Sequence, residues 1–436
     1  MTERREVSRR SFIQQTAGST LAACLASGAA PALGAIGANE RINLGFIATG
    51  DRNSFHISQF KDMPDVGIVA LCDVDRSHLE KAAASLDGKP AQFEDFRKVL
   101  EMKEVDAVVV APPEHWHAIP TIMACQAGKD VYVEKPLGHN IKEGRAIVDA
   151  AKKYNRIVAI GTQQRSGPHW IEAVEIIKSG KLGKISAVRC FNQWGINSMG
   201  GKGMQGIGNP PDSDPPEGVN YDRWLGPAPK RRFNPNRFHF YFYFFWDYSG
   251  GMVSAWGVHL HDIVLWAMGY DIRAVTCTGG NYVFKDNRET PDTAEVIWEC
   301  PNYTFTYSVR HGNGRAVTGD MDHGIEFSGT DASLFINRKE YRIYPEDAPE
   351  KPTVVKARGM DIPHKLNFLE CVRTRKQPNA DALTGHLGTI PGYLANISYR
   401  VGRKIKWDAE KETIPGDEEA CKLLTRTYRE PWHLPI

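Results

Sequence analysis

Five short runs rich in β-branched residues, separated by stretches with helical periodicity, constrain the fold of this chain most. The runs cover residues 42–47, 67–72, 106–110, 130–133 and 156–160. Between them, segments such as 76–85 and 142–153 carry apolar residues spaced three and four apart, as in helices that bury one face. This alternation predicts a parallel sheet covered on both faces, that is, a Rossmann-like α/β domain.

The length of the chain predicts a second domain. It has 436 residues, against the roughly 150 expected of one domain, and 42% of them are hydrophobic. That composition excludes disordered and multi-span membrane classes. We therefore expect a signal segment (1–38), a Rossmann domain (39–162) and a substrate-binding and oligomerisation domain (163–436), whose sheet includes the strand-like segments 274–278, 294–299, 303–310 and 324–328.

The N-terminal segment has the form of an export signal. Residues 8–13 read SRRSFI and precede an uncharged, Ala-rich stretch to residue 38, which is typical of twin-arginine (Tat) export to the periplasm. Residues 21–24 read LAAC, so a lipid-anchored form through Cys24 is an open alternative. The Tat machinery is thus an expected partner. Without this segment the net charge falls from +2 to zero, which gives no electrostatic basis for binding nucleic acid.

Cysteine usage predicts no metal site. Seven cysteines follow the signal segment, and none forms a CxxC pair or a zinc-like cluster. We expect them to be buried thiols that behave as small hydrophobic residues.

The turn after the first predicted strand is an altered dinucleotide fingerprint. Residues 48–53 read ATGDRN where GxGxxG would stand, and only the middle glycine remains. Gly50 lets the backbone approach a pyrophosphate at a helix N-terminus, and we expect Thr49 and Arg52 to contact the cofactor as well. The second strand ends at Asp73, 23 positions after Gly50, where a carboxylate binds the adenine ribose diol. Because Asp73 would repel a 2′-phosphate, the sequence favours NAD over NADP.

Lys135 follows the strand at 130–133 and is the predicted catalytic cation. A lysine before a turn-forming proline is usually a surface residue. In a sheet that already carries Gly50 and Asp73, however, the position favours an ammonium group beside a nicotinamide and a substrate hydroxyl.

Several motifs, taken together, resemble the Gfo/Idh/MocA family of sugar and polyol oxidoreductases over nearly the whole mature chain. They are APPEHWH (111–117), EKP (134–136), GTQQRS (161–166) and WDYSGG (246–251). The segments DRWLGPAP (222–229), NPNRF (234–238) and YREPW (428–432) are similar to the Tat-exported branch with an extended C-terminus. The resemblance implies a Rossmann domain plus a C-terminal α/β domain with a large, open, mostly antiparallel sheet, and a homo-oligomer.

The resemblance also implies particular site residues. Cofactor contacts fall on Pro112, His117, Glu134, Lys135 and Gln163. The family places a D-x-x-x-H pattern on a helix beside the reacting carbon; here His259 is present, but the aspartate position is Ala255. We expect Lys135 and His259 to be catalytic, with His259 as the general base.

The residues expected to contact substrate are less clearly marked. Asp262 lies three residues beyond His259 and is a candidate to orient its ring, while Arg165 follows the strand at 156–160 and either binds substrate or forms a domain-interface ion pair. Trp246 and Tyr248 are the aromatic candidates for the cleft. For the aromatic run 237–246 as a whole, burial at an interface is preferred over a sugar-stacking wall.

The predicted compartment limits the chemistry. Free NAD is scarce outside the cytoplasm, so an exported enzyme needs tightly bound cofactor. The primary hypothesis is an NAD(H)-dependent oxidoreductase acting on a sugar or polyol hydroxyl. The alternatives are an NAD-dependent redox-neutral glycosidase or lyase, and a non-catalytic sugar-binding relative, which the departures at Ala48, Asp51, Asn53 and Ala255 would favour.

Overall fold

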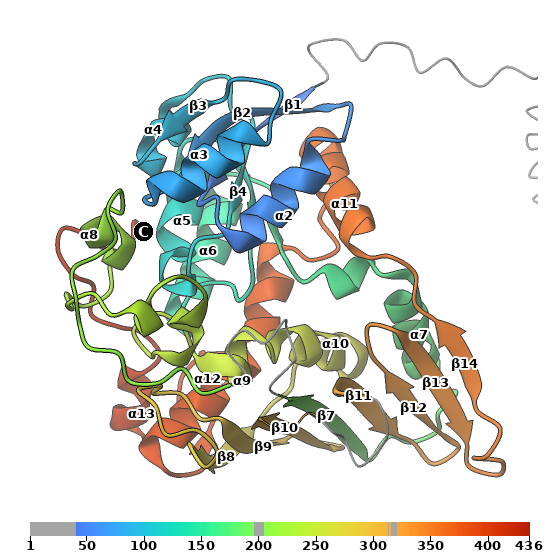
Figure 1. The fold of residues 1–436 in the computed structure, drawn as a ribbon. Helices are drawn as coiled ribbons and strands as arrows, with labels where there is room; N and C mark the ends of the chain where they lie inside the picture. The colour runs from blue at the N-terminus through green and yellow to red at the C-terminus, as the bar shows by residue number, and fades with distance from the viewer. Residues whose placement is uncertain (1–40, 196–204, 313, 315–320) are drawn as a thin grey trace, which may run out of the picture. The chain divides into compact units, whose positions relative to one another are not determined.

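The computed structural model describes residues 41–195, 205–312, 314 and 321–436. The predicted Tat signal and Cys24 lie outside the described residues. Residues Ile42–Ile436 form one compact unit that contains two sheets (Figure 1).

The first sheet is the predicted parallel Rossmann sheet. Its six strands run in the order β3-β2-β1-β4-β5-β6, and every neighbouring pair is parallel. The strands are β1 (Ile42–Ile47), β2 (Val66–Cys72), β3 (Ala91–Phe93), β4 (Ala107–Val110), β5 (Asp130–Val133) and β6 (Val158–Ile160). All residues of β4 and β5 are buried, as expected for central strands covered on both faces. β3 was not predicted because it is a three-residue edge strand without an apolar run.

Helices connect these strands and cover both faces of the sheet. They are α2 (Asp51–Phe60), α3 (Arg76–Ala84), α4 (Phe96–Glu101), α5 (Ala118–Gln126) and α6 (Ile141–Lys153). In α6 the Asn140 side chain caps the first turn, and the apolar residues Ile141, Ala146 and Ile147 face the core. The strand order reverses between β1 and β4, and ligands of such sheets bind beyond the carboxyl ends of the strands at this point.

The second sheet is the predicted large, mostly antiparallel one. Its nine strands run β14-β13-β12-β11-β7-β10-β9-β8-β15, and only β7 and β10 pair in parallel. The strands are β7 (Ala187–Trp194), β8 (Ala274–Gly280), β9 (Thr293–Glu299), β10 (Thr304–His311), β11 (His323–Ser328), β12 (Ala332–Ile336), β13 (Glu340–Pro345), β14 (Thr353–Lys356) and β15 (Ile405–Lys406). On β9, alternate residues are exposed, so one face of the sheet is open.

The C-terminal half of the chain also completes the first domain. Helix α11 (Asp361–Thr374) places Phe368, Leu369 and Cys371 in the core beneath β1 and β2. Helix α12 (Ala382–Val401) packs against α6, α10 and β8. The two sheets are therefore distinct, but their supporting helices are shared between the two halves of the sequence.

The remaining elements surround the carboxyl edge of the first sheet or support the second sheet. They are η2 (Glu114–Trp116), η3 (Gln163–Ser166), α7 (Pro168–Lys178), α8 (Tyr221–Leu225), η5 (Pro235–Arg237), η6 (His239–Phe244), α9 (Gly251–Ala255), α10 (Val258–Met268) and α13 (Glu418–Lys422).

The seven cysteines after residue 38 are free thiols. Five are buried, and Cys300 and Cys421 are partly buried, which agrees with their expected role as small hydrophobic residues. Across the described ranges, the structure has no helix with both the length and the apolar character needed to cross a bilayer.

A buried ion pair joins η3 to α10. Arg165 and Asp262 form a bidentate pair, with Arg165 Nε 2.8 Å and Nη2 2.8 Å from the carboxylate oxygens, and Tyr270 accepts a further bond from Arg165. Both charged side chains are at most 4% exposed. Removing one partner would leave a buried charge uncompensated.

Replacing Arg165 with Met should therefore lower the free energy of unfolding by about 3–5 kcal/mol. The double variant Arg165→Met/Asp262→Leu should recover much of this loss, because neither charge is then buried alone. Denaturant unfolding followed by tryptophan fluorescence measures both. The exposed pair Lys98–Glu101 provides the control, since Lys98→Met should cost no more than about 1 kcal/mol. Additive losses in the double variant would contradict this account.

Candidate active site

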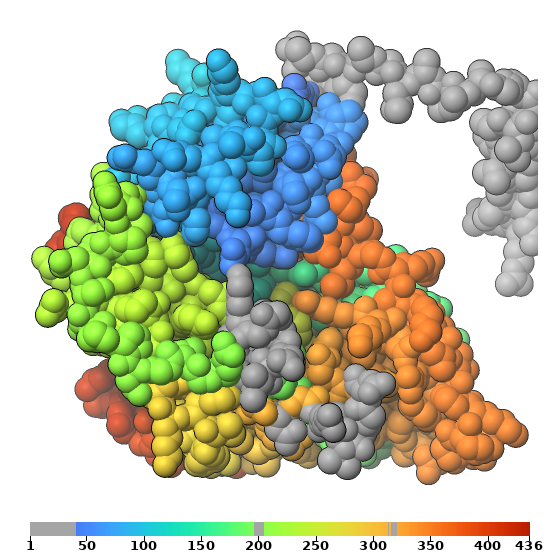
Figure 2. Space-filling view, in the orientation of Figure 1, coloured from blue at the N-terminus to red at the C-terminus, as the bar shows by residue number. Residues whose placement is uncertain are grey.

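A cavity of about 750 Å³ lies at the carboxyl edge of the first sheet, where the strand order reverses. It is lined by the residues that follow β1, β2, β4 and β5 and by the aromatic segment 238–243. The segment between β7 and α9 packs against the N-terminal domain (Figure 2) through a bridge from Asp75 to Val219 and an ion pair from Arg223 to Glu94. Elements from both halves of the chain thus enclose the cavity.

The altered fingerprint keeps the backbone shape of a phosphate-binding turn. Ala48 adopts a left-handed φ of 63°, the conformation that glycine usually provides. A Cβ on Gly50 would lie 3.1 Å from the His78 ring, so this ring packs closely against the turn at Gly50. Asn53, which stands at the third glycine position, is buried and donates from Nδ2 to the carbonyl of Ala48 at 2.6 Å and to that of Ile47 at 3.2 Å. The departures from GxGxxG are therefore compensated within the turn.

Asp73 connects this turn to the end of β2. Its Oδ2 accepts from the Thr49 amide at 2.6 Å and from Thr49 Oγ1 at 3.1 Å, and its Oδ1 accepts from the Asp75 amide. Asp73 lines the cavity, whereas Thr49 is buried behind it. Thr49, which was expected to contact the cofactor, therefore holds the carboxylate of Asp73 instead.

Glu134 is the centre of a buried charge network at the end of β5. Its Oε1 accepts from Arg52 Nε at 2.6 Å and from His56 Nε2 at 2.9 Å. Burial alone would raise the pKa of Glu134, but Arg52 and His56 hold it well below its usual value. Burial lowers the pKa of His56 to about 3, so its neutral ring donates. Arg52, which was expected to contact the cofactor, lines the cavity, and its Nε is bonded to Glu134.

Lys135 lines the cavity beside this network. Its amide donates to Glu134 Oε2 at 3.1 Å, and its Nζ donates to the carbonyl of Ala255 at 2.9 Å. The ammonium also lies 5.7 Å from the centre of the Tyr243 ring, within cation–π range. Burial lowers the pKa of Lys135, and the nearby carboxyl groups of Glu134 and Glu114 oppose that shift.

His259 lies close to Lys135 but not on the helix that was expected. Helix α9 ends at Ala255 and α10 begins at Val258, so positions 255 and 259 do not share one continuous helical face. His259 is 4% exposed, its Nδ1 has no hydrogen-bond partner among the described residues, and its ring contacts Trp256. Burial and the charges of Arg338 and Lys135 keep its pKa well below the usual value. The ring is therefore neutral.

The structure corrects the two charged residues expected at the substrate. Both oxygens of Asp262 are bound by Arg165, so Asp262 does not orient His259. Neither residue lines the cavity; of the two alternatives for Arg165, the geometry favours the structural ion pair.

The structure also changes which aromatic residues are assigned to the cavity. Tyr248 is fully buried against Trp224 and His115, and Trp246 packs on Tyr399; neither lines the cavity. Instead, Phe238, His239, Phe240, Tyr241, Phe242 and Tyr243 form one wall. This run therefore lies against the N-terminal half, as the interface prediction implied, and also lines the cavity, because aromatic residues alone do not distinguish an interface from a cavity wall.

The other expected cofactor residues divide into two groups. Gly50, Pro112 and His117 line the cavity, and the His117 ring lies between the carbonyls of Pro136 and Pro112, which ties the loops after β4 and β5 together. Gln163 is buried in η3 and does not line the cavity.

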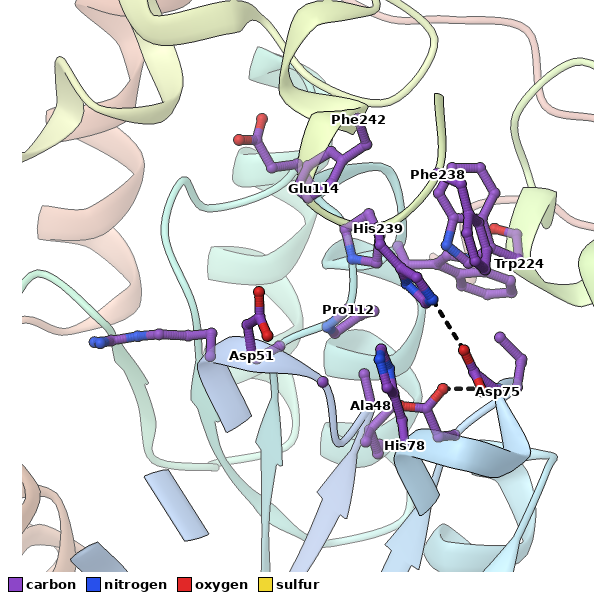
Figure 3. A pocket seen from close by; sticks show the side chains of 18 of the residues that line it. Ala48, Asp51, Asp75, His78, Pro112, Glu114, Trp224, Phe238, His239 and Phe242 are labelled. Atoms are coloured by element: carbon purple, nitrogen blue, oxygen red, sulfur yellow. Dashed lines mark hydrogen bonds and ion pairs between the residues drawn. The ribbon is translucent and has the colours of Figure 1, made fainter. Parts of the chain in front are cut away.

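Figure 3 shows residues that line the cavity. At one end, His239 Nε2 bonds to Asp75 Oδ2 at 2.9 Å, and His78 lies beside them. Glu114 and Phe242, which also line the cavity, are labelled apart from this group. Sequence reasoning missed Glu114, His239 and Tyr243, although Glu114 stands inside the APPEHWH motif and directly after a strand end, where a ligand-facing residue is expected.

Two family models cover most of the chain. Residues 42–162 match a model described as "Oxidoreductase family, NAD-binding Rossmann fold", and residues 173–434 match "Oxidoreductase family, C-terminal alpha/beta domain".

Individual relatives are distant. The scyllo-inositol 2-dehydrogenase (NAD(+)) of Bacillus subtilis is 24% identical over 80% of this chain and 91% of its own length. An alpha-N-acetylgalactosaminidase of Shewanella oneidensis is 25% identical, but the match covers only 34% of each chain. The solved WlbA dehydrogenase of Bordetella pertussis, in complex with NADH and UDP-GlcNAcA, has a TM-score of 0.61 at 19% identity and covers 84% of this chain and 99% of its own.

Replacing Asp73 with Ser should weaken NAD binding and reduce the preference for NAD over NADP by about tenfold or more. The substitution removes the carboxylate that would bind a ribose diol and repel a 2′-phosphate. Titration calorimetry with both nucleotides measures the ratio of their affinities. As a control, Asp95→Ser alters an acidic residue that does not line the cavity and should leave the ratio unchanged. An unchanged ratio in Asp73→Ser would show that this end of the cavity does not hold the adenine ribose.

Proposed function

Because the chain belongs to the Gfo/Idh/MocA oxidoreductase family, we propose that it transfers a hydride between NAD(H) and a CH–OH carbon of a sugar or polyol. The observation that carries this proposal is that Lys135 and Asp73 line one cavity at the carboxyl edge of the NAD-binding sheet. Lys135 is suited to bind a reacting hydroxyl, and Asp73 is suited to bind the adenine ribose at the other end of the cofactor. The inositol and nucleotide-sugar dehydrogenases among its relatives support the substrate class.

The residues present fit NAD. Gly50 lines the cavity without a side chain, and Asp73 presents a carboxylate where a ribose diol is bound in such folds. NADP fits less well, because its 2′-phosphate would face Asp73 and the neighbouring Asp75. When bound, the nicotinamide supplies the acceptor or donor of the hydride.

The chain's own residues handle the proton. The Lys135 ammonium is held by the Ala255 carbonyl and can donate a hydrogen bond to a substrate hydroxyl. Burial lowers its pKa, which makes loss of its proton easier than for a solvent-exposed lysine. His259 does not line the cavity, but its ring is neutral and its pKa responds to the Lys135 ammonium, so its role as acceptor of the hydroxyl proton stays part of the proposal.

The proposed enzyme is exported by the Tat route to the periplasm and retains its NAD. The SRRSFI segment at residues 8–13 supports export, with lipid anchoring through Cys24 as the alternative form. Denaturing the protein purified without added nucleotide should release close to one NAD(H) per chain, identified by mass and absorbance. An empty protein would contradict tight retention.

A redox-neutral glycosidase is the second candidate. It is favoured by the match to an alpha-N-acetylgalactosaminidase, although that match spans only a third of either chain. Release of nitrophenol from nitrophenyl glycosides without net NADH would establish it. A non-catalytic sugar-binding role is less favoured by the structure than by the sequence, because Ala48 and Asn53 maintain the backbone of the cofactor turn.

A homo-oligomer is proposed from the open face of the second sheet. Ile297 on this face is 48% exposed between the exposed residues Glu295 and Glu299. Light scattering of the purified protein tests this proposal.

Replacing Lys135 with Met should reduce the rate of sugar or polyol oxidation by at least about 100-fold, because no ammonium group remains at the reacting hydroxyl. NADH absorbance with a panel of inositols and hexoses measures the rate. Bound nucleotide should remain, since the Gly50 turn and Asp73 are unchanged.

The matched control is Lys153→Met, at an exposed position in the last turn of α6. It should retain full activity. Unchanged activity in Lys135→Met would refute the assignment of this residue.

A further inference from the structure

Glu114 is a buried carboxyl group that the mechanism above does not use. It begins η2, directly after Pro112 and Pro113 at the end of β4, and it lines the cavity while being only 1% exposed. In Figure 3 it is labelled away from Asp75 and His78. A carboxyl group buried in this way requires a physical explanation.

The hydrogen bonds of Glu114 do not explain its burial. Neither carboxyl oxygen of Glu114 has a hydrogen-bond partner of good geometry among the described residues. Burial raises the pKa of this group to about 7, and the ammonium of Lys135, with smaller help from Ser249 and the Gly250 amide, limits the rise. Unsatisfied buried groups of this kind are often functional.

Helix α9 fixes Glu114 and Lys135 near each other. Ser249 and Gly250, next to Glu114, lead into this helix, and Ala255, whose carbonyl binds Lys135 Nζ, ends it. Five residues at about 1.5 Å each span only about 7.5 Å. The two charged side chains therefore meet the two ends of a single short helix.

Besides Glu114, the charges of Glu134, Arg52 and Arg338 act on Lys135. Glu134 also acts on Lys135, but it is bonded to Arg52 and His56. The positive charge of Arg338 lowers the pKa of Lys135. The Lys135 ammonium in turn lowers the pKa values of His117 and His259. Of the two carboxyl groups that act on Lys135, Glu114 is thus the one without a positively charged hydrogen-bond partner within the described structure.

We propose that Glu114, on η2 in the wall of the same cavity, is a positioning residue that acts through Lys135. Its carboxylate stabilises the ammonium form of Lys135 inside the cavity. The inference rests on the proposed oxidoreductase function, but its effect on Lys135 is defined without turnover.

The sign of the effect follows from charge. When Glu114 loses its proton, its negative charge favours the Lys135 ammonium, so the lysine retains its proton to higher pH. Replacing Glu114 with Gln removes this charge, and Lys135 should lose its proton at lower pH. A shift of about one pH unit is expected for a unit charge several ångströms away in a partly screened site.

The test measures the protonation of Lys135 directly. Brief pulses of acetic anhydride at a series of pH values, followed by peptide mass spectrometry, give the fraction of Lys135 present as the reactive free amine. In Glu114→Gln the midpoint should fall by about one unit, in Glu114→Asp it should stay near that of the wild type, and the pH profile of kcat should shift in the same direction. Glu80→Gln, at an exposed position on α3, is the control and should change neither profile.

Two results would overturn the proposal. One is an unchanged Lys135 midpoint in a folded Glu114→Gln variant; the other is a Glu114→Asp variant that shifts as far as Gln, which would indicate a packing role only. If Glu114→Gln does not fold, the wild-type labelling profile decides: it should show a second inflection near pH 7 as Glu114 titrates, and its absence counts against the proposal. A shifted midpoint without sugar turnover in any variant would support Glu114 while refuting the proposed function.

Discussion

The buried negative charge of Glu134 is the interaction on which the rest of the site depends. It lies at the end of a fully buried strand and is stabilised by Arg52 and His56 from α2. A Cβ on Gly161 would lie 2.8 Å from its carboxylate, so the neighbouring strand must end in a residue without a side chain. Because this network joins β5, β6 and α2, it fixes the backbone from which Lys135 enters the cavity.

The second half of the chain completes the site by supplying its walls and the group that holds Lys135. The Ala255 carbonyl receives the ammonium, η6 provides the aromatic wall, and His239 bonds to Asp75 across the far end of the cavity. Charge and shape in this site therefore come from segments more than 100 residues apart in sequence. The cavity exists only when both halves are packed together.

The parts of the fold that depend on local pattern were predictable. The strand runs were predicted correctly, and Gly50, Asp73 and Lys135 line one cavity because a parallel sheet brings its carboxyl ends to one edge. The break between α9 and α10 was not predicted, because the sequence around Gly257 is compatible with one continuous helix. The partners of Arg52 and Asp262 also could not be inferred, since long charged side chains choose among partners that only tertiary structure brings within reach. The same reason explains why the aromatic run was not assigned to the cavity wall and why Glu114 was overlooked.

Isotope transfer tests the central claim most directly, namely that this cavity joins a nicotinamide to a hydroxyl-bearing carbon at Lys135. The protein would be incubated with inositols and hexoses uniformly deuterated at carbon, and the nucleotide released on denaturation would be weighed by mass spectrometry. The account predicts that at least one compound adds one deuterium to the nicotinamide ring, and that Lys135→Met prevents this. Nucleotide that remains unlabelled throughout the panel, from a protein that demonstrably binds both NAD and sugar, would contradict it.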